Sequence, residues 1–140
     1  MISPFNDVNI PFRIEIYEGL GEVHGRLCIG EGVLRIEYLM KDAVIGLLRT
    51  EARELNVALE SIDEIDFHDG WFRKRLTIRA GSISSFADIP GAENGVLVLK
   101  IARKDTQRAL QAVSSLRLLL AEAKLKALDG WEQRPLPDLT

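Results

Sequence analysis

The stretch "WFRKRLTIR" (71–79) holds the side chains of this chain that are best suited to bind phosphate. Alternate side chains of a β-strand point to the same face, so Trp71, Arg73, Arg75 and Arg79 would share one side. A guanidinium group binds phosphate oxygens in bidentate fashion, and an indole ring offers a stacking plane. This face is therefore a candidate site for phosphate or a lipid headgroup.

A solvated strand face explains the same residues without a ligand. The preceding segment is rich in acids that could form cross-strand ion pairs with the arginines: Asp63, Glu64, Asp66 and Asp69. The opposite side of the strand, with Phe72, Leu76 and Ile78, would then supply the core. We favour this interpretation over the phosphate site.

The other chemistry-bearing residues form no catalytic or metal-binding pattern. Asp63, Asp66 and His68 lack the glycine and ligand spacing of a calcium loop, and zinc would need more His or Cys. His24 and Cys28 lie four residues apart on a predicted strand, about 13 Å by strand rise, which is too far for proton transfer. We predict no catalytic residues, no bound metal and no cofactor.

Composition and charge narrow the class of protein. The 140 residues are 46% hydrophobic and 28% charged, as expected for one globular domain, and the single cysteine excludes an internal disulfide. No apolar run is long enough to span a membrane and the start lacks a secretory signal pattern, so we expect a cytoplasmic protein. Residues 1–70 carry 6 Lys/Arg and 14 Asp/Glu (net −8), and residues 71–140 carry 12 and 7 (net +5). This balance argues against a nucleic-acid partner.

Strand patterns occupy the chain as far as about residue 102. Alternation in "FRIEIY" (12–17) and "VLRIEYLM" (33–40) predicts half-buried strands, and glycines near 20 and 31 predict tight turns. "AVIGLL" (43–48) continues this meander. Further strands are predicted near 53–59, 64–68, 71–79 and 96–101, with Asp69-Gly70 as a hairpin turn.

A helical period replaces the strand period from Asp105 to Leu128. Asp105 is a candidate N-cap and Gly130 a candidate terminator. One stripe of the helix is predicted to face the core: Ala109, Val113, Leu116, Leu120, Ala123 and Ala127. Leu110, Leu118 and Leu125 lie off that line, beside Ser114 and Ala121, and form a candidate self-association face.

This succession of strands and one C-terminal helix resembles a pleckstrin-homology-like domain of bacterial or GRAM type, over about residues 12–128. The resemblance rests on "VLRIEYLM", "LNVALESIDEI", "HDGWF" and "GVLVLKIARKDTQRALQAVSSLRLLL". It implies two packed, strongly bent antiparallel sheets that form a barrel, a helix that plugs one open end, and binding rather than catalysis.

Two features depart from that family. Many of its members carry a tryptophan in the C-terminal helix, whereas Trp131 follows the helix predicted here. The lipid-binding members place Lys and Arg around the first hairpin, whereas this chain has Glu18 and Glu22, which would repel a phosphorylated headgroup. The second departure weighs against lipid binding at the first hairpin.

These observations predict a mainly β (α+β) domain at 12–128, between an N-terminal extension (1–11) and a C-terminal tail (129–140). We expect a non-catalytic binding or assembly module with a protein partner, including further copies of the chain in a homo-oligomer. The alternative is a peripheral membrane adaptor that binds anionic lipid headgroups through the Trp/Arg strand face.

Overall fold

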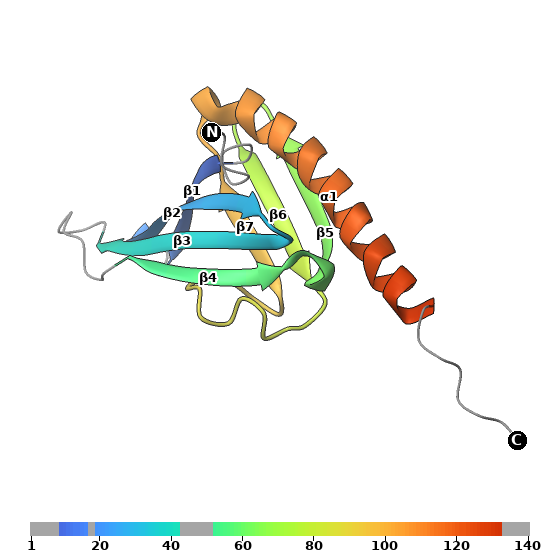
Figure 1. Cartoon of the computed structure of the whole chain (residues 1–140). Coiled ribbons are helices and arrows are strands. Elements are labelled where there is room, and N and C mark those ends of the chain that lie inside the picture. The colour runs from blue at the N-terminus through green and yellow to red at the C-terminus, as the bar shows by residue number, and fades with distance from the viewer. Residues whose placement is uncertain (1–8, 17–18, 43–51, 133–140) are drawn as a thin grey trace, which may run out of the picture.

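The computed structural model describes residues 9–16, 19–42 and 52–132. It is mainly β, with one long C-terminal helix (Figure 1). The predicted strand at 43–48 and most of the predicted N-terminal extension and tail lie outside the described residues. The strands are β1 (Asn9–Ile16), β2 (Gly21–Gly30), β3 (Val33–Asp42), β4 (Arg53–Ala58), β5 (Ile62–Asp69), β6 (Lys74–Ala80) and β7 (Val96–Lys100). The helices are the 3₁₀ turns η3 (Leu59–Ser61) and η4 (Arg103–Asp105) and the α-helix α1 (Thr106–Glu132).

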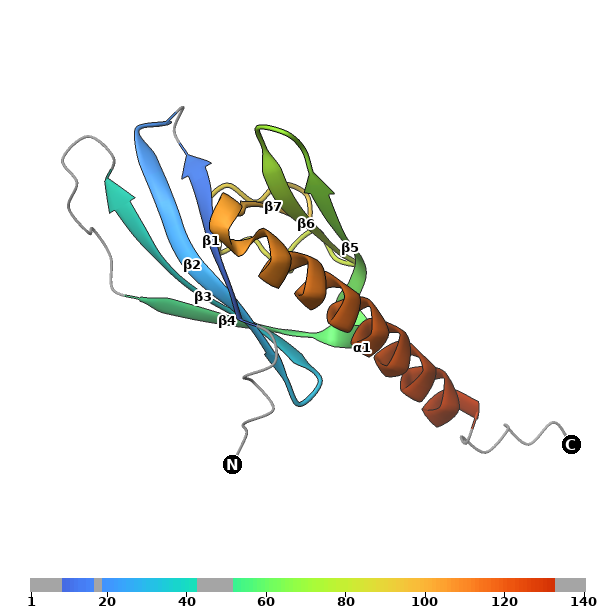
Figure 2. The ribbon, with the colours of Figure 1, turned by 90° about the horizontal axis from the view of Figure 1, so that it is seen from above.

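The described strands form one antiparallel sheet in the order β4-β3-β2-β1-β7-β6-β5. The expected closed barrel of two sheets is wrong, because the sheet is open and its end strands β4 and β5 are not neighbours in it. Between β1 and β7 the ladder holds a single pair, Arg13 opposite Lys100. The sheet turns at this narrow joint, so a four-stranded half and a three-stranded half enclose the core between them, with α1 across the opening (Figure 2).

The tight turns and close packing of the four-stranded half follow from its glycines. The β2–β3 turn consists of Glu31 and Gly32, both at positive φ (55° and 75°), which matches the twist of a two-residue hairpin. Gly25 of β2 lies directly opposite Phe12 of β1, and a Cβ at Gly25 would lie 2.4 Å from the Phe12 ring. Glycine at this position therefore lets the ring pack across the strand.

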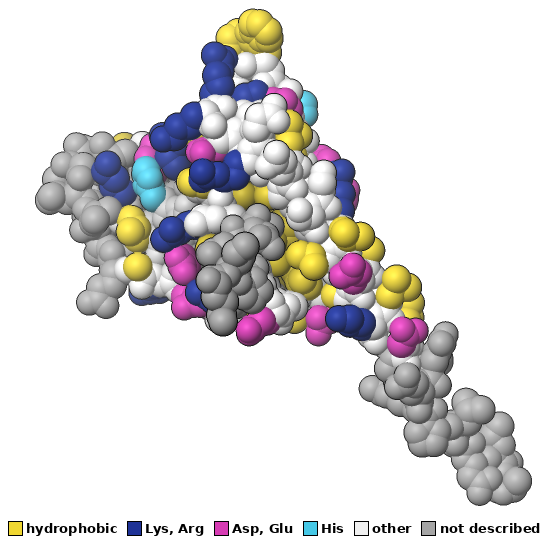
Figure 3. Space-filling view, turned by 45° about the horizontal axis from the view of Figure 1, so that its top comes forward, with side chains coloured by type: hydrophobic (Ala, Val, Ile, Leu, Met, Phe, Trp, Pro, Cys, Tyr) yellow, Lys and Arg dark blue, Asp and Glu magenta, His cyan; other side chains and the backbone are white. Residues whose placement is uncertain are grey.

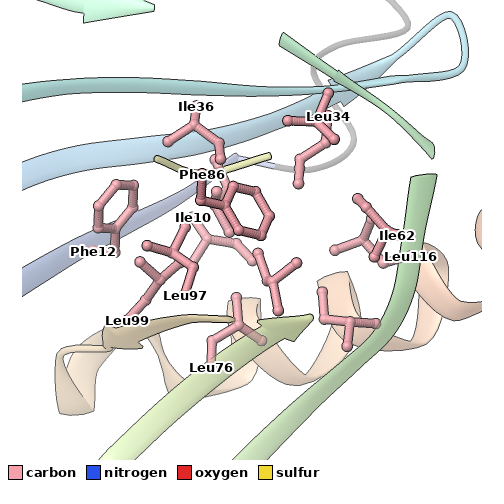
Figure 4. Packing of buried hydrophobic residues seen from close by; sticks show 14 of the residues in the cluster. Ile10, Phe12, Leu34, Ile36, Ile62, Leu76, Phe86, Leu97, Leu99 and Leu116 are labelled. Carbon is pink, nitrogen blue, oxygen red and sulfur yellow. The ribbon is translucent and has the colours of Figure 1, made fainter. Parts of the chain in front are cut away.

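The core confirms the predicted alternation in most strands. The expected inward side chains of β1 and β3 are buried, except for the partly buried Met40, and Ile10 is buried as well, so the domain begins before residue 12. Phe86 and Ile89, which no sequence pattern marked as core, are fully buried although they lie in the long connection between β6 and β7. Figure 4 shows side chains from both halves of the sheet, this connection and the helix meeting in one cluster, among them Phe12, Leu34, Leu76, Phe86, Leu97 and Leu116.

The helix begins where the sequence predicts and ends later. Its inward residues are buried as expected as far as Leu120, and Ala112 joins them. The predicted stop at Gly130 is wrong, because α1 continues through Gly130 to Glu132 and so includes Trp131. At about 1.5 Å per residue, its 27 residues span about 40 Å. The C-terminal part of α1 therefore extends beyond the sheet (Figures 1 and 2).

Candidate functional site

The hairpin tip, Trp71 and Phe72, is an exposed apolar feature at one end of the molecule. The two side chains are 80% and 88% exposed, and their rings meet edge to face with centroids 6.3 Å apart. Both lie in the connection between β5 and β6. The Gly70 N–H donates to the Arg73 carbonyl (3.0 Å), which closes a longer loop than the predicted two-residue turn. The prediction that Phe72 belongs to the core is therefore wrong, since β6 begins only at Lys74.

Cationic side chains gather on one side of the hairpin tip. A hollow of about 210 Å³ is lined by Phe72 together with Arg13, Arg73, Arg75 and Lys100. These cations come from β1, β6, β7 and the loop before β6, and they meet because Arg13, Lys100 and Arg75 are ladder partners across three strands. Figure 3 shows hydrophobic atoms at this end of the molecule, with Lys and Arg side chains next to them.

Glu15 is an acid within this group of cations. Its carboxylate lies 2.6 Å from the Lys100 ammonium. The hydrogen bond and charge of Lys100, with smaller contributions from Arg13 and Arg73, hold the pKa of Glu15 below its usual range. Three cations thus act on one carboxylate on this side of the tip.

More cations lie on the other side of the hairpin tip, next to the start of α1. A hollow of about 630 Å³ is lined by Trp71, Lys74, Arg103 and Lys104, among others. Lys74 is paired with Asp69 across the hairpin, whereas Arg103 and Lys104 are exposed on η4. We call the seven cations on both sides the basic collar: Arg13, Arg73, Lys74, Arg75, Lys100, Arg103 and Lys104.

The three arginines that the sequence placed on one strand face do not all belong to the basic collar. Arg73 and Arg75 belong to the collar. Arg79 lies opposite Glu64, four residues beyond Arg75 and so about 13 Å further along the strand. Two of the four acids expected to pair with the arginines contact other cations: Asp69 contacts Lys74, and Asp66 lies 3.1 Å from Arg117 of the helix. The sequence could not reveal the additional cations, because only the fold brings Arg13, Lys100 and η4 to the hairpin.

A second exposed apolar surface runs along α1. Leu118, Leu125 and Leu128 are 62%, 59% and 58% exposed, and Leu110 is 38% exposed. With the exposed Ala121, they lie on the side of the helix away from the sheet. We call this surface the outer helix stripe: Leu110, Leu118, Ala121, Leu125 and Leu128. Three of its leucines were predicted from the sequence, and Leu128 was not.

Charged residues flank the outer helix stripe, and two of them also bind the sheet. Arg117 donates from Nε to the Ile65 carbonyl (3.3 Å) and from Nη2 to Asp66 (3.1 Å). Lys124 donates from Nζ to the Asp63 carbonyl (3.3 Å). These bonds connect one flank of the helix to β5. On the other flank Glu122 and Asp129 are exposed.

The sequence also singled out a cysteine, a histidine and a group of acids as chemistry-bearing residues. Cys28 is buried, and this desolvation raises the pKa of its thiol, so little reactive thiolate forms. The His24 ring lies 2.7 Å from Glu22. Within the described ranges, His, Cys, Asp and Glu form no group of three or more that could ligate a metal ion. Over the same residues, no helix is both long and apolar enough to span a bilayer.

Comparison with known proteins adds no relative: the chain matches no family model, no curated protein and no solved structure.

Proposed function

We propose that this chain is a non-catalytic assembly module that binds protein through the outer helix stripe, and that its partners include further copies of itself. The observation that carries the proposal is the exposure of Leu118, Leu125 and Leu128, each more than half exposed on one face of a helix whose opposite face packs on the sheet. Contiguous exposed apolar surface with a polar rim is typical of protein interfaces. The buried thiol of Cys28 supports a role without nucleophilic catalysis.

We also propose a fold family and a cellular compartment for this chain. The seven antiparallel strands and the C-terminal helix of the described residues support a distant pleckstrin-homology-like fold, although this sheet is open. We propose the cytoplasm as the compartment, on the grounds of the sequence features given above.

Light scattering at several protein concentrations tests the assembly role. We expect a mass above that of one chain that rises with concentration, and we expect Leu118→Glu with Leu125→Glu to restore the single-chain mass. Leu20→Glu is the matched control, because Leu20 is 60% exposed and lies outside the helix. A wild-type chain that stays monomeric throughout, or a double variant that still assembles, would show that the outer helix stripe does not mediate self-association.

The hairpin tip favours a second candidate function, contact with an anionic membrane surface. Exposed aromatic rings suit the headgroup region of a bilayer, and a one-sided set of cations adds electrostatic attraction to anionic lipid. This extends the Trp/Arg hypothesis, with Arg13, Lys74, Lys100, Arg103 and Lys104 in place of Arg79.

Vesicle sedimentation tests this candidate. The chain is expected to bind phosphatidylglycerol-containing vesicles and to bind neutral phosphatidylcholine vesicles weakly. Arg73→Glu with Arg75→Glu should lower the affinity at least about tenfold, because each charge contributes about 1 kcal/mol near an anionic surface. The control, Arg26→Glu with Arg53→Glu, makes the same change in net charge on the four-stranded half. Equal losses in both variants would mean that net charge, rather than the hairpin tip, controls binding.

A further inference from the structure

The spacing along the outer helix stripe is that of a two-stranded coiled coil. From Ser114 onward, the outward residues follow one another at intervals of four, three, four and three: Ser114, Leu118, Ala121, Leu125 and Leu128. Their mean spacing of 3.5 residues is the heptad repeat, with Leu118 and Leu125 at a positions and Ala121 and Leu128 at d positions. At 3.6 residues per turn, this seam lies roughly 140° around the helix from the residues that face the sheet. The helix could therefore contact a second helix without leaving its own sheet.

The charges beside the seam differ in sign between its two flanks. The g positions hold Arg117 and Lys124, and the e positions hold Glu122 and Asp129, all of them exposed. In a parallel pair, each g residue faces the e residue five positions later on the other helix. Arg117 would then meet Glu122 of the other copy, and Lys124 would meet Asp129. In an antiparallel pair g faces g and e faces e, which brings like charges together.

Resting on the assembly role above, we propose that two copies of this chain pair through α1, with the helices parallel and in register. The charge pattern selects a second copy as the occupant of the stripe, since one flank of the helix is complementary to its own other flank. The twofold axis of such a pair runs along the helices. The two sheets then lie on opposite outer sides, where they do not compete for the seam.

The contacts that Arg117 and Lys124 make within one chain are compatible with this pairing. Arg117 uses Nε and Nη2 toward β5, and a guanidinium carries further donors at Nη1. Lys124 uses one bond of an ammonium that has three donors. The side chain of Arg117 is 58% exposed, so a carboxylate of the other copy can reach it from solvent.

The end of the helix is the part that benefits most from a partner. From Leu125 to Asp129 every side chain is exposed, so this stretch gains little packing from its own sheet. Isolated helices shorter than about 12–15 residues are marginal in water, and most helix stability comes from packing of an apolar face. A paired copy would supply that packing at Leu125 and Leu128.

Cysteine cross-linking tests the orientation separately from self-association. In a chain carrying Cys28→Ala, Leu125→Cys places equivalent residues opposite each other in a parallel, in-register pair, within the Cα separation of about 5.5–6 Å that a disulfide prefers. We expect most of this variant to become a covalent dimer under mild oxidation. Lys126→Cys is the control, because that residue is exposed next to the seam but outside it, and it should remain largely monomeric.

The outcomes separate this inference from the proposed function. Mass doubling in light scattering without a Leu125→Cys cross-link would overturn the parallel register and leave self-association standing. A chain that is monomeric at all concentrations would overturn both. Circular dichroism of each variant confirms that the fold is intact, and all the changed helix positions are on the surface.

Charge exchange tests the contribution of the flanks. Arg117→Glu with Lys124→Glu makes both flanks acidic, and Glu122→Lys with Asp129→Lys makes both basic. Each variant alone should dimerise at least about tenfold more weakly than the wild type, and an equimolar mixture should recover a heterodimer. Equal dimerisation of the wild type, the two variants and the mixture would overturn the role of the charges.

Discussion

The outer helix stripe and the hairpin tip are both exposed and apolar, but the charges around them differ. The stripe has cations on one flank and carboxylates on the other, at heptad spacing. The tip is surrounded mainly by cations, with Glu15 and Asp69 as the acids paired to them. Opposite signs on the two flanks are complementary to a copy of the same helix. A surface of a single sign is complementary to an extended surface of the opposite charge.

The difference between the hairpin tip and the outer helix stripe shows that exposed apolar area alone does not identify a partner. Trp71 and Phe72 are more exposed than any leucine of the stripe, yet they occupy only the end of one hairpin. The leucines are less exposed individually, but they extend along several turns of helix. The geometry of the apolar surface and the signs of the neighbouring charges together distinguish the two proposals.

The largest expected effect is on the free energy of unfolding, and it distinguishes two leucines that lie two residues apart on the helix. Leu116 is fully buried, so Leu116→Ala should lower the free energy of unfolding by about 2–5 kcal/mol. Leu118→Ala should change it by less than about 0.5 kcal/mol, because Leu118 contacts solvent in the monomer. Urea denaturation at low protein concentration measures both. A large loss for Leu118→Ala would mean that the outer helix stripe belongs to the core.

A smaller effect, limited to vesicle binding, is expected from Trp71→Ala with Phe72→Ala. Loss of both rings should weaken binding to anionic vesicles by about tenfold or more, because large aromatic anchors dominate such contacts. Dimer mass should stay the same. Ile83→Ala is the control, since Ile83 is 74% exposed in the β6–β7 connection.

Raising the salt concentration to about 1 M, where the Debye length is about 3 Å, should weaken vesicle binding more than dimerisation. A larger loss of dimerisation than of vesicle binding would contradict the assignment of the two surfaces.

The smallest effect is expected from the titration of Glu15. Lys100 holds the pKa of this carboxyl below its usual range in the folded chain. The ion pair therefore contributes stability above the pKa of the unfolded chain, and this contribution is lost as the pH falls through the lower folded pKa. Protonation also makes the basic collar more positive, so vesicle binding should strengthen slightly over the same window. Glu15→Gln should remove that pH dependence. NMR titration of the Glu15 carboxyl measures its pKa. A midpoint at the usual value would contradict the ion pair between Glu15 and Lys100.

Much of the fold could be predicted because local patterns determine it. The alternation in β1, β3 and β6 identified the inward residues, since one face of each strand is buried. The change to a helical period located the start of α1 within one residue. The error at Gly130 has a local cause: a glycine inside a helix costs only about 1 kcal/mol, so it permits a stop without requiring one.

The rest depends on contacts between distant segments, which no local pattern contains. Phe86 and Ile89 lie in a segment without strand or helix period, yet they fill the core. The end strands β4 and β5 are not neighbours, so the sheet is open, whereas the resemblance to pleckstrin-homology-like domains implied a barrel. The candidate residues Trp71, Arg73, Arg75 and the three leucines came from the sequence, whereas Arg13 and Lys100 join the collar only through sheet pairing.

The position of the hairpin tip beside the first turn of α1 has a further consequence. Trp71 shares a hollow with Arg103 and Thr106, and the helix runs away from this end of the sheet across the molecule (Figures 1 and 2). In a parallel pair of helices both tips fall at the same end, so the assembly would be bivalent toward a flat surface. Two weak contacts held together in this way gain avidity without any new contact. A chain unable to pair would then hold a membrane less firmly, even with every side chain of its tip intact.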